Sequence, residues 1–146
     1  VLTDGESFIN QPMEVGGMQW NVTAVSVGNP HAVVFVDNVD WLDLPTIGPL
    51  FENCPLFPER INTEFVQVID RTTLKMRVWE RGSGETLACG TGSTAALAAA
   101  VVNGKCEPYA KLLLRGGELN IEWNRDENLI YMTGPAVTVF DGELLL

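Results

Sequence analysis

The sequence predicts an α+β fold in which a curved, mostly antiparallel sheet forms a pseudo-barrel around one central Ala-rich helix. Two observations lead to this prediction. Residues 93–102 are small and apolar on every side, so they should form a helix that lies inside a domain. Most of the remaining chain consists of short segments of alternating polar and apolar residues, separated by turn residues, which is typical of antiparallel strands.

Before the helix, the alternation predicts five strands, at 7–9, 21–27, 31–36, 63–69 and 73–80. A turn is expected at Gly16-Gly17, and Gly28-Asn29-Pro30 separates the second strand from the third. Residues 70–72 should form the turn of a hairpin between the last two strands. A short helix is expected at 46–53, between two prolines.

Asn103-Gly104 is expected to end the central helix. After it, the pattern predicts four more strands, at 110–115, 118–123, 129–133 and 136–140. Turn residues separate these strands, which is typical of an antiparallel meander. We expect the loops of the sheet, and with them the functional site, to lie at the start of the central helix.

Composition restricts the class of protein. The 146 residues are expected to form one domain with its own core. Nine basic and nineteen acidic residues give a net charge of -10, which argues against nucleic acid and anionic membrane surfaces as partners. No apolar run is long enough for a membrane span and no secretory signal is visible. The chain begins at Val1, so we expect a processed product or a piece of a longer chain.

The three cysteines have neither metal-ligand spacing nor an even number, which favours a reducing cytoplasm over a disulfide framework. We expect Cys54 and Cys106 to be structural. No zinc set, phosphate-binding loop or dinucleotide fingerprint is present in the sequence.

Cys89-Gly90-Thr91-Gly92 directly precedes the helix. The two glycines allow a tight turn and a close approach to a ligand, and Thr91 or Ser93 is expected to cap the helix. The first backbone N–H groups, at the positive end of the helix dipole, predict a site for an anion such as a carboxylate. We also expect this position to lower the pKa of the Cys89 thiol, whose thiolate can act as a base or nucleophile. Simple packing is the alternative role of a lone cysteine.

Three other positions present polar side chains at the ends of predicted strands. Asn29 and His31, the only histidine, flank a sharp turn, although such a histidine can also be structural. Asn62 precedes a strand, where asparagine is often only a turn former. Glu80 and Arg81 end the strand before the cysteine loop; they form either a surface ion pair or a clamp for the charged groups of an amino acid.

These motifs together resemble the diaminopimelate epimerase family. The matching segments are 27–31, 57–66, 80–86, 88–92 and, near the end, 131–136. Enzymes of that family have two similar lobes, each a curved sheet around a helix, and each lobe supplies one catalytic cysteine to the cleft between them. The match covers the second half of the family, so residues 1–146 are expected to be the C-terminal lobe. Cys89 fits its cysteine, and the cysteine motif of the N-terminal lobe is absent.

The resemblance implies an isomerase that converts LL-diaminopimelate to the meso form, without pyridoxal phosphate, another cofactor or a metal, in cytoplasmic lysine and peptidoglycan precursor synthesis. A thiolate and a thiol on opposite faces of the substrate would exchange the α-proton. The implied catalytic residues are Cys89, His31 and Glu80, of which the last two would bias cysteine protonation. The implied substrate-binding residues are Asn29, Asn62, Glu80, Arg81, Gly90 and Thr91.

The resemblance also bears on partners and on alternative functions. The N-terminal lobe is the expected partner, a homodimer is a further candidate, and the isolated chain should fold but be inactive, with an exposed apolar face. The alternatives are a proline racemase-like lobe, a non-catalytic amino-acid-binding lobe, a cysteine hydrolase using Cys89 with His31, and a phenazine-type isomerase relative. Asn29, Asn62 and the 80–86 segment favour diaminopimelate epimerase over proline racemase, and Cys89 argues against the phenazine type.

Overall fold

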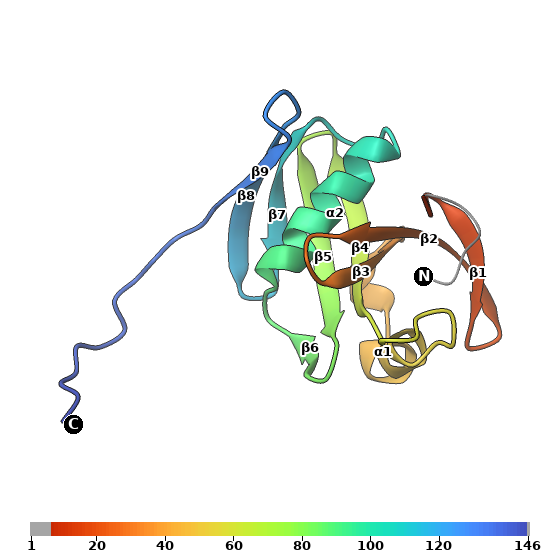
Figure 1. Cartoon of the computed structure of the whole chain (residues 1–146), viewed down its shortest axis with the longest axis horizontal. Helices are drawn as coiled ribbons and strands as arrows, with labels where there is room; N and C mark the ends of the chain where they lie inside the picture. Colours follow the sequence, from red (N-terminus) through yellow and green to blue (C-terminus); the bar gives the residue numbers. More distant parts are fainter. Residues whose placement is uncertain (1–6, 146) are drawn as a thin grey trace.

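The computed structural model describes residues 7–145, which form one mixed, curved sheet with two α-helices (Figure 1). The strand order is β1-β2-β3-β4-β5-β7-β8-β9, and β6 pairs with β5. The strands are β1 (Gln11–Val15), β2 (Met18–Ser26), β3 (Pro30–Phe35), β4 (Asn62–Asp70), β5 (Thr73–Glu80), β6 (Gly84–Thr86), β7 (Tyr109–Leu114), β8 (Gly117–Asn124) and β9 (Leu129–Thr133). The helices are α1 (Leu44–Glu52), α2 (Gly90–Val102) and a short 3-10 turn, η1 (Val39–Trp41). The predicted α+β fold is confirmed.

Helix α2 is the centre of the fold. It contacts seven strands, β2 to β5 and β7 to β9, and Figure 1 shows it lying across the sheet that curls around it. Residues 95–100 are all buried, and five of the six are alanine, so the helix can approach the strands closely. Neighbouring strands are antiparallel except for the parallel pairs β3–β4 and β5–β7. None of the described helices is long and apolar enough to cross a membrane.

The central strands are buried on both faces because each face carries a helix. Alternate side chains point to opposite sides of a strand, so Val66 packs in the cluster around α2 while Phe65 packs in the cluster around α1. In the second cluster, the ring of Phe65 packs edge-on against Phe51 of α1 and Trp20 of β2. This double burial fixes the register of β3 and β4, whose first residues border the site described below.

Several elements differ from the sequence prediction. Residues 7–9 form no strand; the first strand is β1, which pairs with β2 through the predicted turn at Gly16-Gly17. Helix α1 begins at Leu44, because Pro45 is tolerated in a first helical turn, where an N–H would have no partner. The three-residue strand β6 was not predicted, since so short a segment has no alternation to recognise.

The strand predicted at 136–140 is wrong for this structure. Its alternation of apolar residues is real, but the segment leaves the sheet after β9 and extends away from the body of the molecule (Figure 1). Val137, Val139 and Phe140 are each more than four-fifths exposed. A strand needs a neighbour to satisfy its backbone hydrogen bonds, and no described segment lies beside this one.

A buried carboxylate joins α1 to the end of β5. Glu52 Oε1 accepts hydrogen bonds from Arg60 Nη1 (2.8 Å) and the backbone N–H of Gly82 (2.9 Å), and Oε2 accepts one from Trp79 Nε1 (2.8 Å). Burial alone would raise the pKa of Glu52, but the hydrogen bonds from Trp79 and Gly82 and the charge of Arg60 outweigh it, so the pKa is lowered. Glu52 therefore anchors the turn that follows Arg81.

We predict that Glu52→Ala lowers the free energy of unfolding by about 2–4 kcal/mol, because three donors lose a charged acceptor. The lowered pKa means that this stabilisation is complete above the unfolded-state carboxyl pKa of about 4.3 and is lost as the pH falls through the folded-state value. Urea unfolding at neutral and acidic pH would measure both effects. The exposed control Glu14→Ala should change stability by less than about 0.5 kcal/mol, and equal stability of the two variants would contradict the prediction.

Candidate active site

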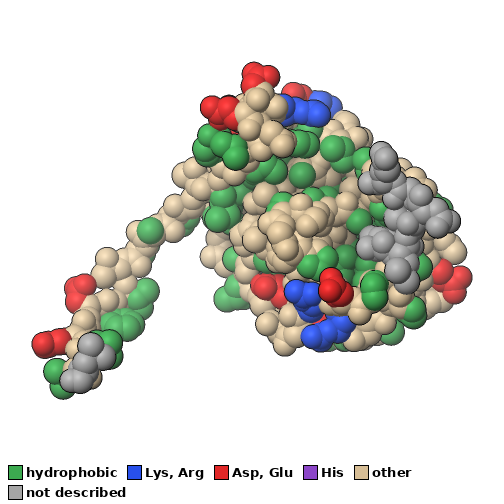
Figure 2. All heavy atoms as spheres, viewed as in Figure 1, with side chains coloured by type: hydrophobic (Ala, Val, Ile, Leu, Met, Phe, Trp, Pro, Cys, Tyr) green, Lys and Arg blue, Asp and Glu red, His purple; other side chains and the backbone are tan. Residues whose placement is uncertain are grey.

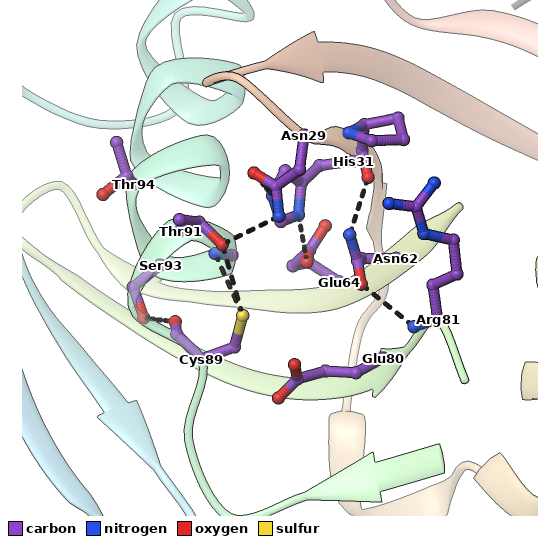
Figure 3. Close-up of polar contacts among 12 residues, drawn as sticks. Asn29, His31, Asn62, Glu64, Glu80, Arg81, Cys89, Thr91, Ser93 and Thr94 are labelled. Atoms are coloured by element: carbon purple, nitrogen blue, oxygen red, sulfur yellow. Dashed lines mark hydrogen bonds and ion pairs between the residues drawn. The ribbon is translucent and has the colours of Figure 1, made fainter. Parts of the chain in front are cut away.

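The candidate site lies where α2 begins, against the ends of β3, β4 and β5 (Figure 3). The alternation of side chains along a strand explains why polar groups gather there. Val33, Val66 and Val78 pack in the cluster around α2. The polar residues two positions away on the same strands, His31, Glu64 and Glu80, therefore face the same side. In the register of the sheet, His31 lies opposite Asn62, and Glu64 lies opposite Val78.

Cys89 itself caps α2. Its backbone is extended, its Sγ accepts a hydrogen bond from the N–H of Gly92 (3.3 Å), and its carbonyl oxygen accepts one from the Ser93 hydroxyl (2.8 Å). The expectation that Thr91 or Ser93 would be the capping residue is wrong, and the helix begins at Gly90 because the thiol takes the place of a capping hydroxyl. The sulfur is therefore fixed at the first turn of the helix.

The N–H groups of Gly90 and Thr91 stand beside this sulfur. No acceptor in the described part of the chain bonds to either of them. Both residues lie at the surface of the site, Thr91 exposed and Gly90 half-buried. Two such donors at the positive end of a helix can bind an anion such as a carboxylate, and the binding of a ligand there stays a prediction.

The pKa of the Cys89 thiol is raised, not lowered as the sequence suggested. Burial is the largest cause, and the negative charge of the Glu80 carboxylate adds to it. Hydrogen bonds from Thr91 and from the N–H of Gly92 act in the opposite direction but do not outweigh burial. The helix terminus was the only influence visible in the sequence. The half-buried position of Cys89 and the nearby charge of Glu80 became visible only in the fold. Cys89 therefore keeps its proton at neutral pH.

His31 is joined to the cysteine through two intermediate side chains. The ring is fully buried, with Nδ1 2.7 Å from Glu64 Oε1 and Nε2 3.1 Å from Asn29 Oδ1. Asn29 Nδ2 donates to Thr91 Oγ1 (3.3 Å), which lies 3.6 Å from Cys89 Sγ. Figure 3 shows this chain of contacts. Because both ring nitrogens are engaged away from the sulfur, His31 does not form the nucleophile–base contact that a cysteine hydrolase needs.

Asn62 and Arg81 are linked through the backbone. Asn62 is only 6% exposed; its Nδ2 donates to the carbonyl oxygen of Pro30 (2.9 Å) and its Oδ1 accepts from the N–H of Arg81 (2.9 Å). It thus holds the start of β3 next to the end of β5. The Arg81 guanidinium donates to the carbonyl oxygen of Glu59 (2.9 Å).

Glu80 and Arg81 do not pair with each other. Among the described residues, the Glu80 carboxylate accepts a hydrogen bond from the Thr86 hydroxyl and forms no salt bridge with Arg81. Of the two alternatives for Glu80 and Arg81, the surface ion pair is therefore wrong. Both side chains are half-buried, on either side of the strand end, which leaves them available to a ligand.

All eight residues predicted for the site thus lie around one helix terminus, and sequence reasoning missed one more, Glu64. It is fully buried and touches the site through His31. A signal existed: an acidic residue directly before Phe65 and Val66 in a predicted strand, two positions after Asn62 and hence on the same face.

The other two cysteines lie away from the site. Cys54 and Cys106 are buried and free, one in each hydrophobic cluster, and burial raises the pKa of Cys106 to about 11. No group of three or more metal-binding side chains within residues 7–145 is arranged to hold a metal ion.

The fold and the site define an α+β protein with an open, curved sheet around a helix capped by a cysteine. This fold is similar to that of a Bacillus anthracis phenazine biosynthesis protein of the PhzF family, with a TM-score of 0.54 and 20% identity over 77% of this chain and 38% of that chain. A Clostridium difficile protein described as a putative phenazine biosynthesis PhzC/PhzF protein gives a TM-score of 0.52 at 18% identity, over 73% and 40% of the two chains. At this level of identity, the similarity concerns the fold alone.

Sequence comparison identifies the family. The family model described as diaminopimelate epimerase matches residues 23–139. The chain is 61% identical over 144 residues to a diaminopimelate epimerase of Acetivibrio thermocellus, covering 99% of this chain and 51% of the relative. It is 58% identical over 139 residues to one of a Cyanothece species, covering 95% and 50%. The chain belongs to the diaminopimelate epimerase family, and it spans about half the length of the curated relatives it matches.

We predict that an alkylating reagent such as iodoacetamide modifies Cys89 and spares the buried Cys54 and Cys106 in the folded protein. Because the pKa of Cys89 is raised, alkylation of its thiol at neutral pH should be slower than that of a free cysteine. The rate of alkylation should increase with pH. Glu80→Gln removes a neighbouring negative charge and should increase the rate severalfold at a fixed pH, whereas the distant Glu14→Gln should not. Mass spectrometry of the labelled peptides would check this, and labelling of Cys54 or Cys106 first would contradict it.

Proposed function

We propose that this chain is the C-terminal lobe of a cofactor-independent diaminopimelate epimerase and that Cys89 is one of its two acid/base groups. The family of the chain and the names of its relatives support this activity. The second cysteine would come from an N-terminal lobe, a proposal supported by the coverage of only about half of each relative. The reaction would need neither pyridoxal phosphate nor a metal, and it would serve lysine and peptidoglycan precursor synthesis in the cytoplasm.

The observation that carries the proposal is the placement of one thiol beside two free backbone donors. A substrate α-carboxylate bound to the N–H groups of Gly90 and Thr91 would bring its α-carbon next to Cys89 Sγ, since the sulfur caps the same helical turn. The same donors would stabilise the negative charge that develops on the carboxylate when the α-proton leaves. A fixed cradle of this kind needs no rearrangement during the reaction.

Inversion then requires two proton transfers on opposite faces of the α-carbon. A thiolate on one face takes the α-proton, the electron pair of the C–H bond remains on the α-carbon and its carboxylate, and a thiol on the other face delivers a proton. The raised pKa of Cys89 keeps it protonated before reaction. When the reaction starts with Cys89 protonated, Cys89 is the acid and the cysteine of the other lobe is the base. The two cysteines exchange these roles in the reverse reaction.

The side chains around the cradle suit a substrate with two zwitterionic ends. In our proposal, Arg81 pairs with a carboxylate and Glu80 with an ammonium group, while Asn29 contributes amide contacts. Asn62 has one amide hydrogen left after its bonds to the backbone, so it acts chiefly by holding Arg81 in place. Glu80 has a second role, because its charge helps to keep the proton on Cys89.

An apolar groove is consistent with a second lobe that packs on this chain. The groove, of about 390 Å³, lies between β2, α2 and β9, with Val25, Ala98, Val102 and Ile130 among its lining residues. Figure 2 shows the side of the molecule on which α2 lies; apolar and uncharged groups occupy its centre, and charged side chains gather at its margins. Patches of this kind on a small protein commonly mark an interaction surface.

The test is exchange of the α-hydrogen of diaminopimelate in D2O, followed by NMR and by separation of the stereoisomers. We expect no exchange with this chain alone, and exchange with inversion when the chain is joined to the upstream half of the Acetivibrio thermocellus relative. Cys89→Ala should abolish inversion in the joined protein, whereas Cys106→Ala, at a buried cysteine outside the site, should retain it.

Four outcomes would count against this proposal. Turnover by the chain alone would show that no second lobe is needed. Full activity of Cys89→Ala would remove the thiol from the mechanism. Exchange of proline in place of diaminopimelate would identify a proline racemase-like lobe, and binding without exchange of either amino acid would leave a non-catalytic binding lobe.

A further inference from the structure

Glu64 has no role in the function proposed so far, although it is the most completely enclosed charged residue near the site. Its side chain and that of His31 are both inaccessible to solvent, and Nδ1 and Oε1 lie 2.7 Å apart. The opposite carboxyl oxygen, Oε2, is buried without a hydrogen-bond partner among the described residues. A carboxyl group in this position needs an explanation, because an unpaired buried charge is costly.

The contact with Asn29 indicates which nitrogen of His31 carries a proton. Its Nδ2 donates to Thr91 Oγ1, which leaves Oδ1 facing His31 Nε2 at 3.1 Å. An amide oxygen only accepts hydrogen bonds, so Nε2 must be the donor. His31 therefore carries a hydrogen on Nε2, and the remaining question is where the proton between Nδ1 and Glu64 lies.

The surroundings favour Glu64 as the holder of that proton. A carboxylate would spread its charge over Oε2, which has neither a donor nor solvent, whereas a neutral carboxylic acid leaves only an uncharged carbonyl oxygen there. Burial raises the pKa of Glu64, and its hydrogen bond to His31 only partly offsets that rise. The other titratable groups close to the pair, Glu80 on β5 and Cys89 on α2, supply no positive charge to hold a carboxylate.

We infer that Glu64 is a neutral carboxylic acid that donates its O–H to His31 Nδ1 and thereby fixes His31 as the neutral Nε2–H tautomer. In this role Glu64 is a positioning residue: the fixed imidazole orients the Asn29 amide, which orients Thr91 against Cys89. Gly92 is part of the same arrangement, because a Cβ there would lie 2.7 Å from Glu64 Oε1. The effect of this network on the reaction rests on the proposed function, but the protonation pattern does not.

The first test is spectroscopic and uses the chain itself, whose single histidine gives an unambiguous signal. In ¹⁵N-labelled protein at about pH 7.5, above the ordinary histidine pKa of about 6.5, we expect a protonated Nε2 and an unprotonated, hydrogen-bonded Nδ1. Infrared spectra should show the C=O stretching band of a buried carboxylic acid, absent from Glu64→Gln. An imidazolium signal, an Nδ1–H tautomer, or the absence of that band would overturn the inference.

Variants separate positioning from simple packing. Glu64→Gln keeps an N–H donor toward Nδ1 and should preserve the tautomer, whereas Glu64→Leu fills the space without a donor and should yield a mixture of tautomers. In the joined two-lobe protein, Glu64→Leu should lower kcat roughly tenfold or more, the size of effect seen when a metal-binding histidine loses its orienting partner, with a smaller change in KM. Glu64→Gln should rescue most of this loss, and Glu14→Gln is the unaffected control.

The two parts of the experiment distinguish failure of this inference from failure of the proposed function. If the joined protein does not act on diaminopimelate, the proposed function fails, while the tautomer and the infrared band still decide the state of Glu64. If the joined protein is active but Glu64→Leu matches the unsubstituted protein in kcat and in its histidine spectrum, Glu64 has no positioning role. Should Glu64→Leu fail to fold, a changed tautomer in Glu64→Gln would overturn the inference.

Discussion

The packing of α2 into the curved sheet is the contact on which the rest of the structure depends. A helix of small side chains can lie close to seven strands at once, and this closeness brings its first turn to the ends of β3, β4 and β5. Larger side chains at residues 95–100 would push the helix outward and separate Cys89 from the polar residues of the strands. The same alanines that build the core therefore also set the geometry of the site.

Two buried carboxyl groups, those of Glu52 and Glu64, hold the site from opposite faces of the sheet. On the α1 side, Glu52 binds the Trp79 indole and the turn after Arg81, and so fixes the end of β5. On the α2 side, Glu64 binds His31, whose contacts lead through Asn29 to Thr91 and the cysteine. Such supporting contacts hold functional groups in place before a ligand arrives, which is the condition for electrostatic stabilisation without rearrangement. The two carboxyl groups differ in protonation because Glu52 has three donors, whereas Glu64 has one partner and no solvent.

Much of this site was predictable from sequence because it depends on local patterns. The small apolar helix, the glycines around Cys89 and the polar residues at strand ends fixed the position of the site and most of its members. What could not be predicted depends on burial and on contacts between distant segments: the raised pKa of Cys89, the role of the thiol as the helix cap, and the partnership of Glu64 with His31. The segment 136–140 illustrates the same limit, since alternation predicts a strand only where a neighbouring strand is present.

The most direct test of the proposed function is a crystal structure of the joined two-lobe protein carrying Cys89→Ala, with diaminopimelate bound. We expect the α-carboxylate to accept hydrogen bonds from the N–H groups of Gly90 and Thr91, with the α-carbon facing the vacated thiol position. Arg81 and Glu80 should contact charged groups of the same molecule. A substrate bound with its carboxylate away from the start of α2, or with its α-carbon turned from residue 89, would contradict the proposed roles of Cys89 and of the Gly90 and Thr91 N–H groups.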